Sequence, residues 1–547
     1  MRKNGFVQID GGAVFEDPLF LYCDYIHGRF YGIDGERRFK GEGFEKMFDE
    51  IRRIRAARLV HFRSNEPQLL VIVNDLNVFS VLVEDFCGDA QSAGQKEHNG
   101  AAHKLEVRTE DFLFRSFNFI ANSRPEALCD FFKVKNPVQA MLLFYRSIAG
   151  KKKLYRMRWS LASITKKIFF QDIRGELWEE MKKEGIFFHA MLHYRDMFAG
   201  SKSGALLRFD DPERGFRKIL TGVQSFDKKS AYPSVLVNDP YFPLSRPVRV
   251  VQGKAEALRN AMQQKHWFKL VIRTDKDFPE LRPFRDPDDK ELYGVEFYDM
   301  MLLKEVLEVP AKRFAEILNG SQWSFYTCKH TGYLADAFRK RIVSLYIQKN
   351  AISDKSNFYR FTLKTQLDII NGKAIQNKPF RTLKEVNKYY TGRGENYLLP
   401  QHAMHAISAV RYELMKLVKL LGNSCIAYDT DGIKCPDGSV FAAMNELIQL
   451  RNERAGFPQS DIGFWLHEWS ADRFLQLCTK SYMYEFEGKL TVKHAGITDA
   501  DFDRYAATIE GDLMQHFTQP RDITVKGRYI YHMDRKIFYR ELNTFRL

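Results

Sequence analysis

The sequence predicts a multidomain protein of the α/β and α+β classes. Its 547 residues exceed what one compact core accommodates, and 45% of them are hydrophobic, so folded cores are expected rather than global disorder. Within residues 1–85, the strand-like runs FVQID, LFLYCDYI and QLLVIVND alternate with a helical pattern in GFEKMFDEIRRIRAARLV. This alternation is typical of layered α/β or α+β architecture.

The net charge indicates which class of partner the chain binds, and the cysteine content indicates the compartment in which it folds. Lys and Arg outnumber Asp and Glu by 84 to 69, a net charge of +15 that favours a polyanionic partner such as nucleic acid or an anionic membrane surface. No apolar stretch reaches the ~20 residues that span a bilayer, and MRKNGFVQID lacks a signal-peptide core, so no membrane insertion is expected. Seven cysteines without a CxxC pair indicate a reduced, cytoplasmic chain with neither a disulfide framework nor structural zinc.

The stretch IAYDTDGIKC, residues 426–435, places Asp429 and Asp431 on either side of Thr430. In a continuous strand the two carboxylates would share one face, which is a cation-binding geometry. The alternative is a tight turn, because Asp-Gly is a strong hairpin signal. The preceding helical pattern, residues 402–421, is closed by Gly422, so strand, turn and strand are expected next, with both aspartates at the hairpin tip.

The same helical pattern contains His402 and His405, one turn apart. Two ligands do not make a metal site, and we expect this pair to be polar helix surface.

Two further segments supply partners for the aspartate pair. VQSFDKKSAYPSVLV puts Asp227 at the end of a strand-like run, with Tyr232 five residues later, before Pro233. RFTLKTQLDIINGK puts Lys364 and Asn371 on one face of a helix. In this order, the three segments resemble motifs A, B and C of family B DNA polymerases.

A fourth segment resembles the protein-primed branch of that family. KSYMYEFEGKLTVKHAG contains Lys480, Tyr482 and Lys493, and it is similar to the Lys-x-Tyr segment of the branch and the stretch that follows it. The resemblance implies a right-hand polymerase with palm, fingers and thumb, preceded by an exonuclease-like (RNase H-like) domain. The domains that it implies are 1–170 (exonuclease-like, inactive), 171–239 (first part of the palm), 240–339 (insertion resembling the region that interacts with a terminal protein), 340–376 (fingers), 377–400 (second, short insertion), 401–500 (second part of the palm) and 501–547 (thumb).

The resemblance also implies roles in two-metal nucleotidyl transfer. Asp227 and Asp431 are expected to hold Mg²⁺, with Mn²⁺ as an alternative, together with the backbone carbonyl of Lys228, while Asp429 adds negative charge nearby. Lys364, with Lys349 or Arg360 from the preceding helix, is expected to neutralise the β and γ phosphates.

Tyr232 is expected to pack under the sugar, held by a Tyr-Pro turn, where its ring excludes a 2′-hydroxyl. Lys480 and Tyr482 are expected to hold the primer-terminal phosphate, with Lys493 on the DNA-binding surface. The basic cluster KKKLYRMR, which begins with Lys151, Lys152 and Lys153, is either a solvated face or a contact to the phosphate backbone.

The motifs depart from the family pattern at several positions. Motif B has Asp368 in place of an Asn and Asn371 in place of the Tyr that stacks on the incoming base, which predicts weaker nucleotide affinity or base-pair checking. Motif C has Ala427 where a Tyr is usual and Gly432 where a Ser is usual. The metal carboxylates are kept.

The N-terminal third departs further. The first exonuclease segment, Asp-x-Glu, is matched only by Asp10, which Gly11 and Gly12 follow. In the second segment Asn74 is present, but Ser80 replaces the expected Asp; the third, in NPVQAMLL, has no Asp. A two-metal nuclease requires its carboxylates, so we expect a structural relic that guides single-stranded template.

The sequence therefore predicts a DNA-templated, protein-primed DNA polymerase without proofreading, from a phage or similar mobile element. Its expected partners are primer-template DNA, dNTPs and a terminal protein, with no membrane and a monomeric state. One alternative is a primer-independent or weakly templated nucleotidyltransferase on the same palm. A second is a non-catalytic nucleic-acid-binding scaffold.

Overall fold

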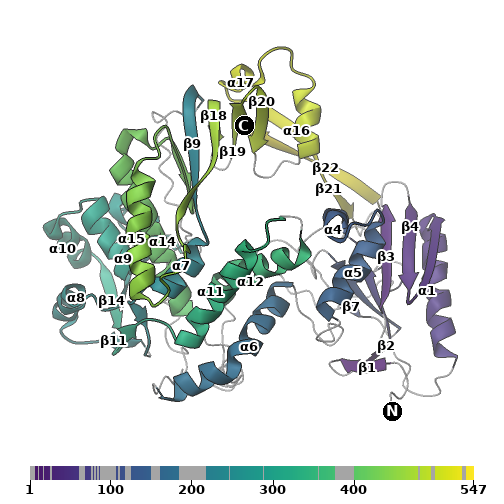
Figure 1. Cartoon of the computed structure of the whole chain (residues 1–547), viewed down its shortest axis with the longest axis horizontal. Helices are drawn as coiled ribbons and strands as arrows, with labels where there is room; N and C mark the ends of the chain where they lie inside the picture. The colour runs from purple at the N-terminus through teal and green to yellow at the C-terminus, as the bar shows by residue number, and fades with distance from the viewer. Residues whose placement is uncertain are drawn as a thin grey trace. The chain divides into compact units, whose positions relative to one another are not determined.

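The computed structural model divides the chain into two compact units (Figure 1). The N-terminal unit comprises Met1–Thr165, Ile352–Thr362 and Lys526–Leu542, and the second unit comprises Lys166–Ala351, Leu363–Val525 and Asn543–Leu547. The structure describes residues 6–9, 12–15, 18–24, 28–60, 68–74, 78, 82, 86, 106–108, 111–117, 125–149, 161–183, 217–245, 247–286, 289–354, 357–375, 400–478, 481–493, 499–532 and 537–546.

The N-terminal unit is built on a six-stranded sheet in the order β5-β4-β3-β6-β8-β7. The pairs β3–β6 and β6–β8 are parallel and the other pairs are antiparallel. The predicted strands at LFLYCDYI and QLLVIVND are confirmed as β3 and β6. The strand bounds are β3 (Leu19–Asp24), β4 (Arg29–Asp34), β5 (Arg37–Glu42), β6 (Leu69–Val73), β7 (Glu106–Arg108) and β8 (Phe112–Ser116).

Helices cover both faces of this sheet. The predicted helix is α1 (Phe44–Leu59), whose apolar positions pack with the buried side chains of β3 and β6. On the other face lie α4 (Pro125–Phe132) and α5 (Pro137–Ala149), and the ring of Tyr145 on α5 lies 5.2 Å from that of Phe20 on β3. β1 (Phe6–Ile9) and β2 (Gly12–Phe15), the first of which was predicted at FVQID, form a separate two-stranded hairpin.

The second unit is built on an antiparallel sheet, called here the main sheet, in the order β16-β17-β9-β18-β19-β20. Its central strand, β9, comes from a part of the sequence far from its two neighbours, so folding brings distant segments side by side (Figure 1). The bounds are β9 (Ile219–Lys228), β16 (Ala427–Asp429), β17 (Gly432–Cys435), β18 (Trp465–Cys478), β19 (Ser481–Phe486) and β20 (Lys489–Lys493).

Long helices accompany the main sheet. The helix predicted at residues 402–421 is α14, which ends at Leu421 as expected; Gly422 follows in a left-handed conformation, with φ 53°. The bounds of α14 are Pro400–Leu421, and the other elements are α6 (Leu161–Lys183), α7 (Ala231–Asn238), α11 (Asp336–Asn350), α12 (Phe358–Ile375), η5 (Gly422–Ser424), α15 (Val440–Arg454), α16 (Asp499–Ala506) and α17 (Leu513–His516). The last two strands, β21 (Asp522–His532) and β22 (Ile537–Arg546), pair with each other in a separate sheet, and Lys526–Leu542 belongs to the N-terminal unit.

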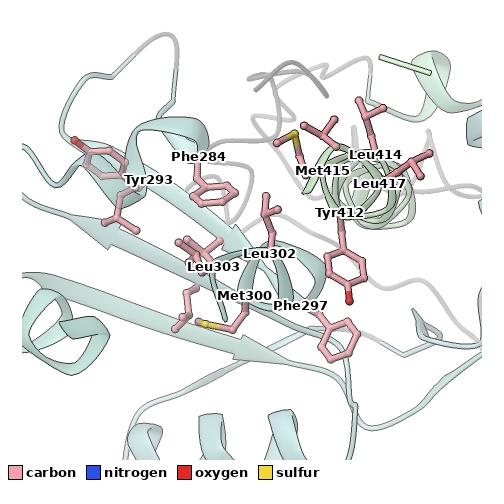
Figure 2. Close-up of a cluster of buried hydrophobic side chains, with 14 of the residues drawn as sticks. Phe284, Tyr293, Phe297, Met300, Leu302, Leu303, Tyr412, Leu414, Met415 and Leu417 are labelled. Atoms are coloured by element: carbon pink, nitrogen blue, oxygen red, sulfur yellow. The ribbon is translucent and has the colours of Figure 1, made fainter. Parts of the chain in front are cut away.

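The segment 240–339 forms a second sheet, in the order β11-β14-β12-β13, that shares a hydrophobic core with α14. Figure 2 shows this core, where Phe297 and Leu302 lie on the side of α14 that carries Tyr412. The elements are β10 (Phe242–Pro243), β11 (Val248–Val250), α8 (Lys254–Gln263), β12 (Phe268–Arg273), η3 (Pro279–Phe284), β13 (Leu292–Glu296), α9 (Phe297–Met301), η4 (Leu302–Val306), α10 (Ala311–Asn319), β14 (Gln322–Thr327) and β15 (Thr331–Gly332).

The prediction that His402 and His405 form polar helix surface is wrong. Only 1% of His402 and 0% of His405 is exposed, because α14 is covered by α7 and by α9. His402 Nε2 lies 3.0 Å from the carbonyl oxygen of Pro243, and the His405 ring lies between two carboxylates, 2.7 Å from Glu296 and 3.1 Å from Asp239. Both side chains are therefore structural groups of the core.

In the described part of the chain, no helix is both long enough and apolar enough to cross a bilayer.

Candidate active site on the main sheet

Asp227 lies near the end of β9, directly opposite Gly432 on β17 and Leu466 on β18. Successive side chains of a strand point to opposite faces. Phe226 enters the core, where its ring stacks on Phe441 at 4.0 Å, so Asp227 points to the other face of the main sheet. The burial of Phe226 therefore determines the face to which the neighbouring Asp227 points.

The two motif C aspartates lie at a hairpin tip, as predicted. Asp429 ends β16, Gly432 begins β17, and Thr430 and Asp431 form the turn between them. The backbone N–H of Lys228 donates to the carbonyl oxygen of Asp431 at 2.8 Å. This bond ties the hairpin tip to the end of β9, so the structure brings Asp227, Asp429 and Asp431 together.

Both segments that carry these acids contain a strained backbone position. Thr430 has φ 48° in the turn, and Ser230, which precedes α7, has φ 51°. Residues other than Gly rarely adopt this region, and a β-branched residue such as Thr least of all. Such strain persists only where the surrounding structure imposes it, and it clusters at functional sites.

The acids repel one another. Burial, followed by Asp431 and Glu468, raises the pKa of Asp227 to about 7, and Lys364 and Lys434 oppose the rise. Burial, followed by Asp429, raises the pKa of Asp431 to about 6. We call the set Asp227, Asp429, Asp431 and Glu468 the acidic cluster. Its four acids outnumber the two cations that lie near them, Lys364 and Lys434.

Glu468 and Lys434 were not predicted from the sequence. Lys434 is two residues after Gly432 on β17, so strand alternation alone would have placed it on the face of Asp227. Glu468 had no such signal, because β18 has a bulge between His467 and Trp469 that interrupts the alternation. The carboxylate of Glu468 accepts a long hydrogen bond, 3.4 Å, from Ser225 Oγ on β9.

Tyr232 lies beside the acidic cluster. Burial, then Asp431 and Asp429, raise the pKa of its hydroxyl to about 12, while Arg411 opposes the rise. The expected Tyr-Pro turn is wrong in form: Tyr232 and Pro233 belong to the first turn of α7. Proline is tolerated there because the first N–H groups of a helix have no partner within it.

The predicted phosphate-binding residues are only partly brought to the site. Lys364, on α12, is close enough to lower the pKa of Asp227. Lys349, on α11, acts on Asp368 in the same way, and its ammonium lies 4.8 Å from the ring of Tyr346. Arg360 was expected on the helix before Lys364, but it lies on α12 itself, one turn earlier. Asn371 is 5% exposed, so it does not present an open surface to a base.

The side chain of Lys228, the residue after Asp227, is held in place by an ion pair. This side chain is buried and pairs with Glu413 of α14, which also pairs with Arg451. Burial alone would raise the pKa of Glu413, but these two cations hold it at about 2. The ion pair with Glu413 therefore anchors Lys228 to α14. The carbonyl oxygen of Lys228 stays a predicted metal ligand.

The predicted DNA-binding residues fall partly outside the described residues. Lys151, Lys152, Lys153 and Lys480 lie there. Tyr482 on β19 is paired in register with Lys493 on β20, whose side chain is exposed. The Lys434 ammonium lies 4.4 Å from the Tyr482 ring, which connects Tyr482 to the acidic cluster.

The acidic cluster fits a hard divalent cation. Its donors are carboxylate oxygens with a backbone carbonyl at hand, which are the ligands that Mg²⁺ prefers. Among the described residues, no three His, Cys, Asp or Glu side chains are grouped so as to hold a metal ion by themselves. Mg²⁺ sites commonly have one or two carboxylates and are completed by water and substrate phosphates, so two aspartates suffice.

The N-terminal sheet has a second candidate site, where the assignment of the first exonuclease segment to Asp10 needs correction. Asp10 lies outside the described residues. The strands that precede and follow it in the sequence, β1 and β2, pair with each other and are not part of the six-stranded sheet. The strand beside β6 is β3, which ends at Asp24. Asn74, just after β6, accepts from the backbone N–H of Cys23 and donates to its carbonyl oxygen, each at 3.0 Å. The acid that adjoins Asn74 is therefore Asp24.

The fold formed by these elements is similar to that of solved DNA polymerase structures. In particular, phi29 DNA polymerase in complex with primer-template DNA and incoming nucleotide substrates superposes with a TM-score of 0.63 at 12% identity, covering 97% of this chain and 99% of that chain. The same polymerase in complex with single-stranded DNA gives a TM-score of 0.59 at 12% identity, covering 94% and 97%. No protein-family model and no curated protein sequence matches the chain. The likeness is thus one of fold.

Proposed function

We propose that this chain is a DNA-templated DNA polymerase. The observation that carries the proposal is the meeting of Asp227 and Asp431 on one face of the main sheet, with Tyr232 and Lys364 beside them, in the fold of phi29 DNA polymerase. Tyr232 and Lys364 come from segments far from the hairpin in the sequence, so their arrival at one place is not a consequence of local patterning.

Each residue has a definable part in the reaction. Asp227, Asp431 and the carbonyl of Lys228 would hold Mg²⁺, with Mn²⁺ as an alternative. When bound, the metal would activate the attacking hydroxyl and neutralise the triphosphate. Lys364 would add positive charge at the phosphates. The Lys228–Glu413–Arg451 ion pairs hold the end of β9 fixed, so Asp227 is positioned before substrate arrives.

A primer-extension assay tests the proposal against its alternatives. The chain would be supplied with a labelled primer on a template of defined length, dNTPs and Mg²⁺. A product of template length is expected. Short additions that do not depend on the template would favour a nucleotidyltransferase, and no incorporation under any condition would favour a non-catalytic scaffold.

Tyr232 is proposed to select deoxynucleotides, because a ring beneath the sugar leaves no room for a 2′-hydroxyl. Tyr232→Ala should raise ribonucleotide use relative to deoxynucleotide use by at least about tenfold, since removing a clash helps only the larger sugar. Tyr232→Phe is the matched control, because it keeps the ring and should keep the selectivity. Equal use of both sugars by the wild-type chain would contradict this role.

The N-terminal unit is proposed to lack 3′–5′ proofreading. Two residues after Asp24 the sequence has Ile26 rather than the Glu of the exonuclease pattern, and Val78, after Asn74, is buried in the hydrophobic core. A two-metal nuclease is not supported by a single carboxylate. Mg²⁺-dependent shortening of end-labelled single-stranded DNA by the wild-type chain, lost in Asp24→Ala, would contradict the proposal.

Protein priming is proposed from the resemblance and from the folded segment 240–339, which has its own four-stranded sheet. Val248, on the edge strand β11, and Val251, which follows that strand, are 47% and 80% exposed. The chain alone should therefore extend a supplied primer but should not start synthesis on unprimed single-stranded DNA. Starts without a primer would favour a primer-independent enzyme.

A further inference from the structure

The N-terminal unit contains a cavity of about 310 Å³ between the edge of its six-stranded sheet and the start of α5. Its volume lies at the lower end of the range for small-molecule sites. Six of the residues that line it are Tyr31, Ile33, Arg38, Lys40, Asn136 and Gln139.

Strand register explains how this cavity acquires its side chains. Tyr31 is paired with Lys40, and Ile33 with Arg38, so these four side chains share one face of β4 and β5. The same face carries Phe20 of β3, which contacts Tyr145 of α5. The cavity therefore opens on the α5 side of the sheet, away from α1.

By the same register Arg29 and Glu42 also lie on this face, two residues beyond the Tyr31–Lys40 pair. Neither Arg38 nor Lys40 has an acidic partner in the described part of the chain. Other arginines of the unit are neutralised: Arg37 pairs with Glu50 and Arg58 pairs with Asp34. Arg37 is next to Arg38 in the sequence, but it points to the α1 face. Arg38 and Lys40 are both exposed, so their charge is available to a ligand at the rim.

The cavity wall formed by Tyr31 suits an aromatic ring of the ligand, and the wall formed by the start of α5 does not offer a site for an anion. Tyr31 is 36% exposed, and its ring lies 6.5 Å from that of Tyr22 in the same row across the sheet. The N–H of Val138 is already bonded to Asn136 Oδ1 at 3.0 Å, and that of Gln139 to the Asn136 carbonyl oxygen at 3.0 Å. An anion would therefore be held by the β5 cations, not by the helix terminus.

We propose that this cavity binds one nucleotide unit, with the base against Tyr31 and the phosphate at Arg38 and Lys40. A bound nucleotide is stabilised by stacking of its base on an aromatic ring and by charge-assisted hydrogen bonds to its phosphate. The amide of Gln139 is placed to meet the edge of the base. A free nucleotide and the end of a single strand present the same chemistry, and the cavity accommodates one unit of either.

The test measures binding of dAMP and of single-stranded hexadeoxyadenylate to the full chain in EDTA. Without a divalent cation, the acidic cluster does not contribute a phosphate site. The double variant Arg38→Ala with Lys40→Ala should bind the preferred probe at least about tenfold more weakly, since two charge-assisted contacts are lost. Tyr31→Ala should also weaken binding.

The matched control is Arg37→Ala with Lys46→Ala, which removes two charges from the α1 side of the same unit and should change binding less than about twofold. Binding of dAMP that depends on Arg38 and Lys40 identifies a free nucleotide as the ligand. Dependence seen only with the oligonucleotide identifies a strand end. Equal loss in both double variants, no loss in either, or no binding of either probe by the wild-type chain would overturn the proposal. The test measures no nucleotide transfer, so its outcome is independent of the polymerase assignment.

Discussion

Two clusters of charged side chains in the second unit differ in their balance. Around α14, three acids face three bases: Asp239, Glu296 and Asp299 with Lys269, His405 and Arg411. On the main sheet, Lys364 and Lys434 face the four acids of the acidic cluster, and Asp368 is close enough to raise the pKa of Asp431 further. Both clusters are at least partly buried, so each charge without a partner is costly.

The balanced cluster holds elements together. Burial opposes the charged form of His405, but Glu296 and Asp239 raise its pKa to about 10, so the ring is charged at neutral pH. This cation joins α14 to the end of β13 and to the residue that caps α7. Its partners are all protein groups, and it leaves nothing for a ligand.

The acidic cluster leaves its charge unmatched. The raised pKa values of Asp227 and Asp431 show that their ionised forms are disfavoured in the folded chain. A bound cation would reverse that penalty. Within this unit, the cluster with matched charges holds elements of the fold together, and the excess of acids on the main sheet is the feature on which the proposed reaction centre rests.

The largest expected effect is on catalysis. Asp227→Ala or Asp431→Ala should lower nucleotide incorporation by at least about a thousandfold, because a lost metal ligand removes several kcal/mol of transition-state stabilisation. DNA binding should change little, since it depends on contacts to the phosphate backbone elsewhere. Single-turnover primer extension and filter binding measure the two quantities.

The same variants should also be more stable than the wild-type chain without metal. Because the folded-state pKa of Asp227 is raised from 3.8 to about 7, the cost of ionising this carboxyl in the folded chain develops as the pH rises between these values and is complete above pH 7. At pH 8 in EDTA, Asp227→Ala should gain about 1 kcal/mol, a figure reduced for solvent screening. Near-normal extension, or a loss of stability together with lost activity, would break the contrast between the clusters.

The balanced cluster should respond in the opposite sense. His405→Gln leaves Glu296 and Asp239 without their shared cation and should cost about 3 kcal/mol of unfolding free energy at pH 6. Because the folded-state pKa of His405 is raised, its contribution is complete below about pH 6.5 and is lost as the pH rises toward 10. The difference in stability between the two chains should therefore shrink between pH 6.5 and 10.

Urea denaturation at several pH values between 6 and 10 measures this difference. The comparison with the wild-type chain at each pH cancels the titration of other groups. A stability difference that does not change with pH would show that His405 is neutral in the folded chain.

The smallest expected effect concerns the strained turn. Thr430 adopts φ 48°, and its Oγ1 donates to Asp429 Oδ1 at 2.9 Å. Thr430→Asn should gain about 0.5–1 kcal/mol, because Asn tolerates this conformation better than a β-branched residue. Thr430→Val keeps the strain and loses the hydrogen bond, so it should cost about 1 kcal/mol. Thermal unfolding that ranks Val above Asn would contradict this account of the turn.

The sequence predicted the elements whose signals are local. The strand ending at Asp227, the hairpin tip with Asp429 and Asp431, and the helix closed by Gly422 follow from alternation, turn chemistry and helix stop signals. That they meet was implied by the resemblance of the three segments, in this order, to motifs A, B and C of family B DNA polymerases. The meeting itself required the pairing of β9 with β17, which no local pattern encodes.

The errors arose where long-range packing decides. The local sequence around His402 and His405 indicates an exposed helix, but α7 and α9 pack against α14 and bury both side chains. Glu468 was missed because a bulge interrupts strand alternation. Asp24 was missed because only the parallel pairing of β3 and β6 shows which strand adjoins Asn74.

The most direct test of the central claim is the change in thermal unfolding temperature that Mn²⁺ produces in the wild-type chain and in Asp431→Asn. If the unmatched charge of the acidic cluster is a cation site, saturating Mn²⁺ stabilises the wild-type chain, by about 2.7 kcal/mol at 100 times the dissociation constant. Asp431→Asn should start from a higher unfolding temperature in EDTA and gain little from Mn²⁺. Equal shifts in both chains, or no shift in either, would contradict the account.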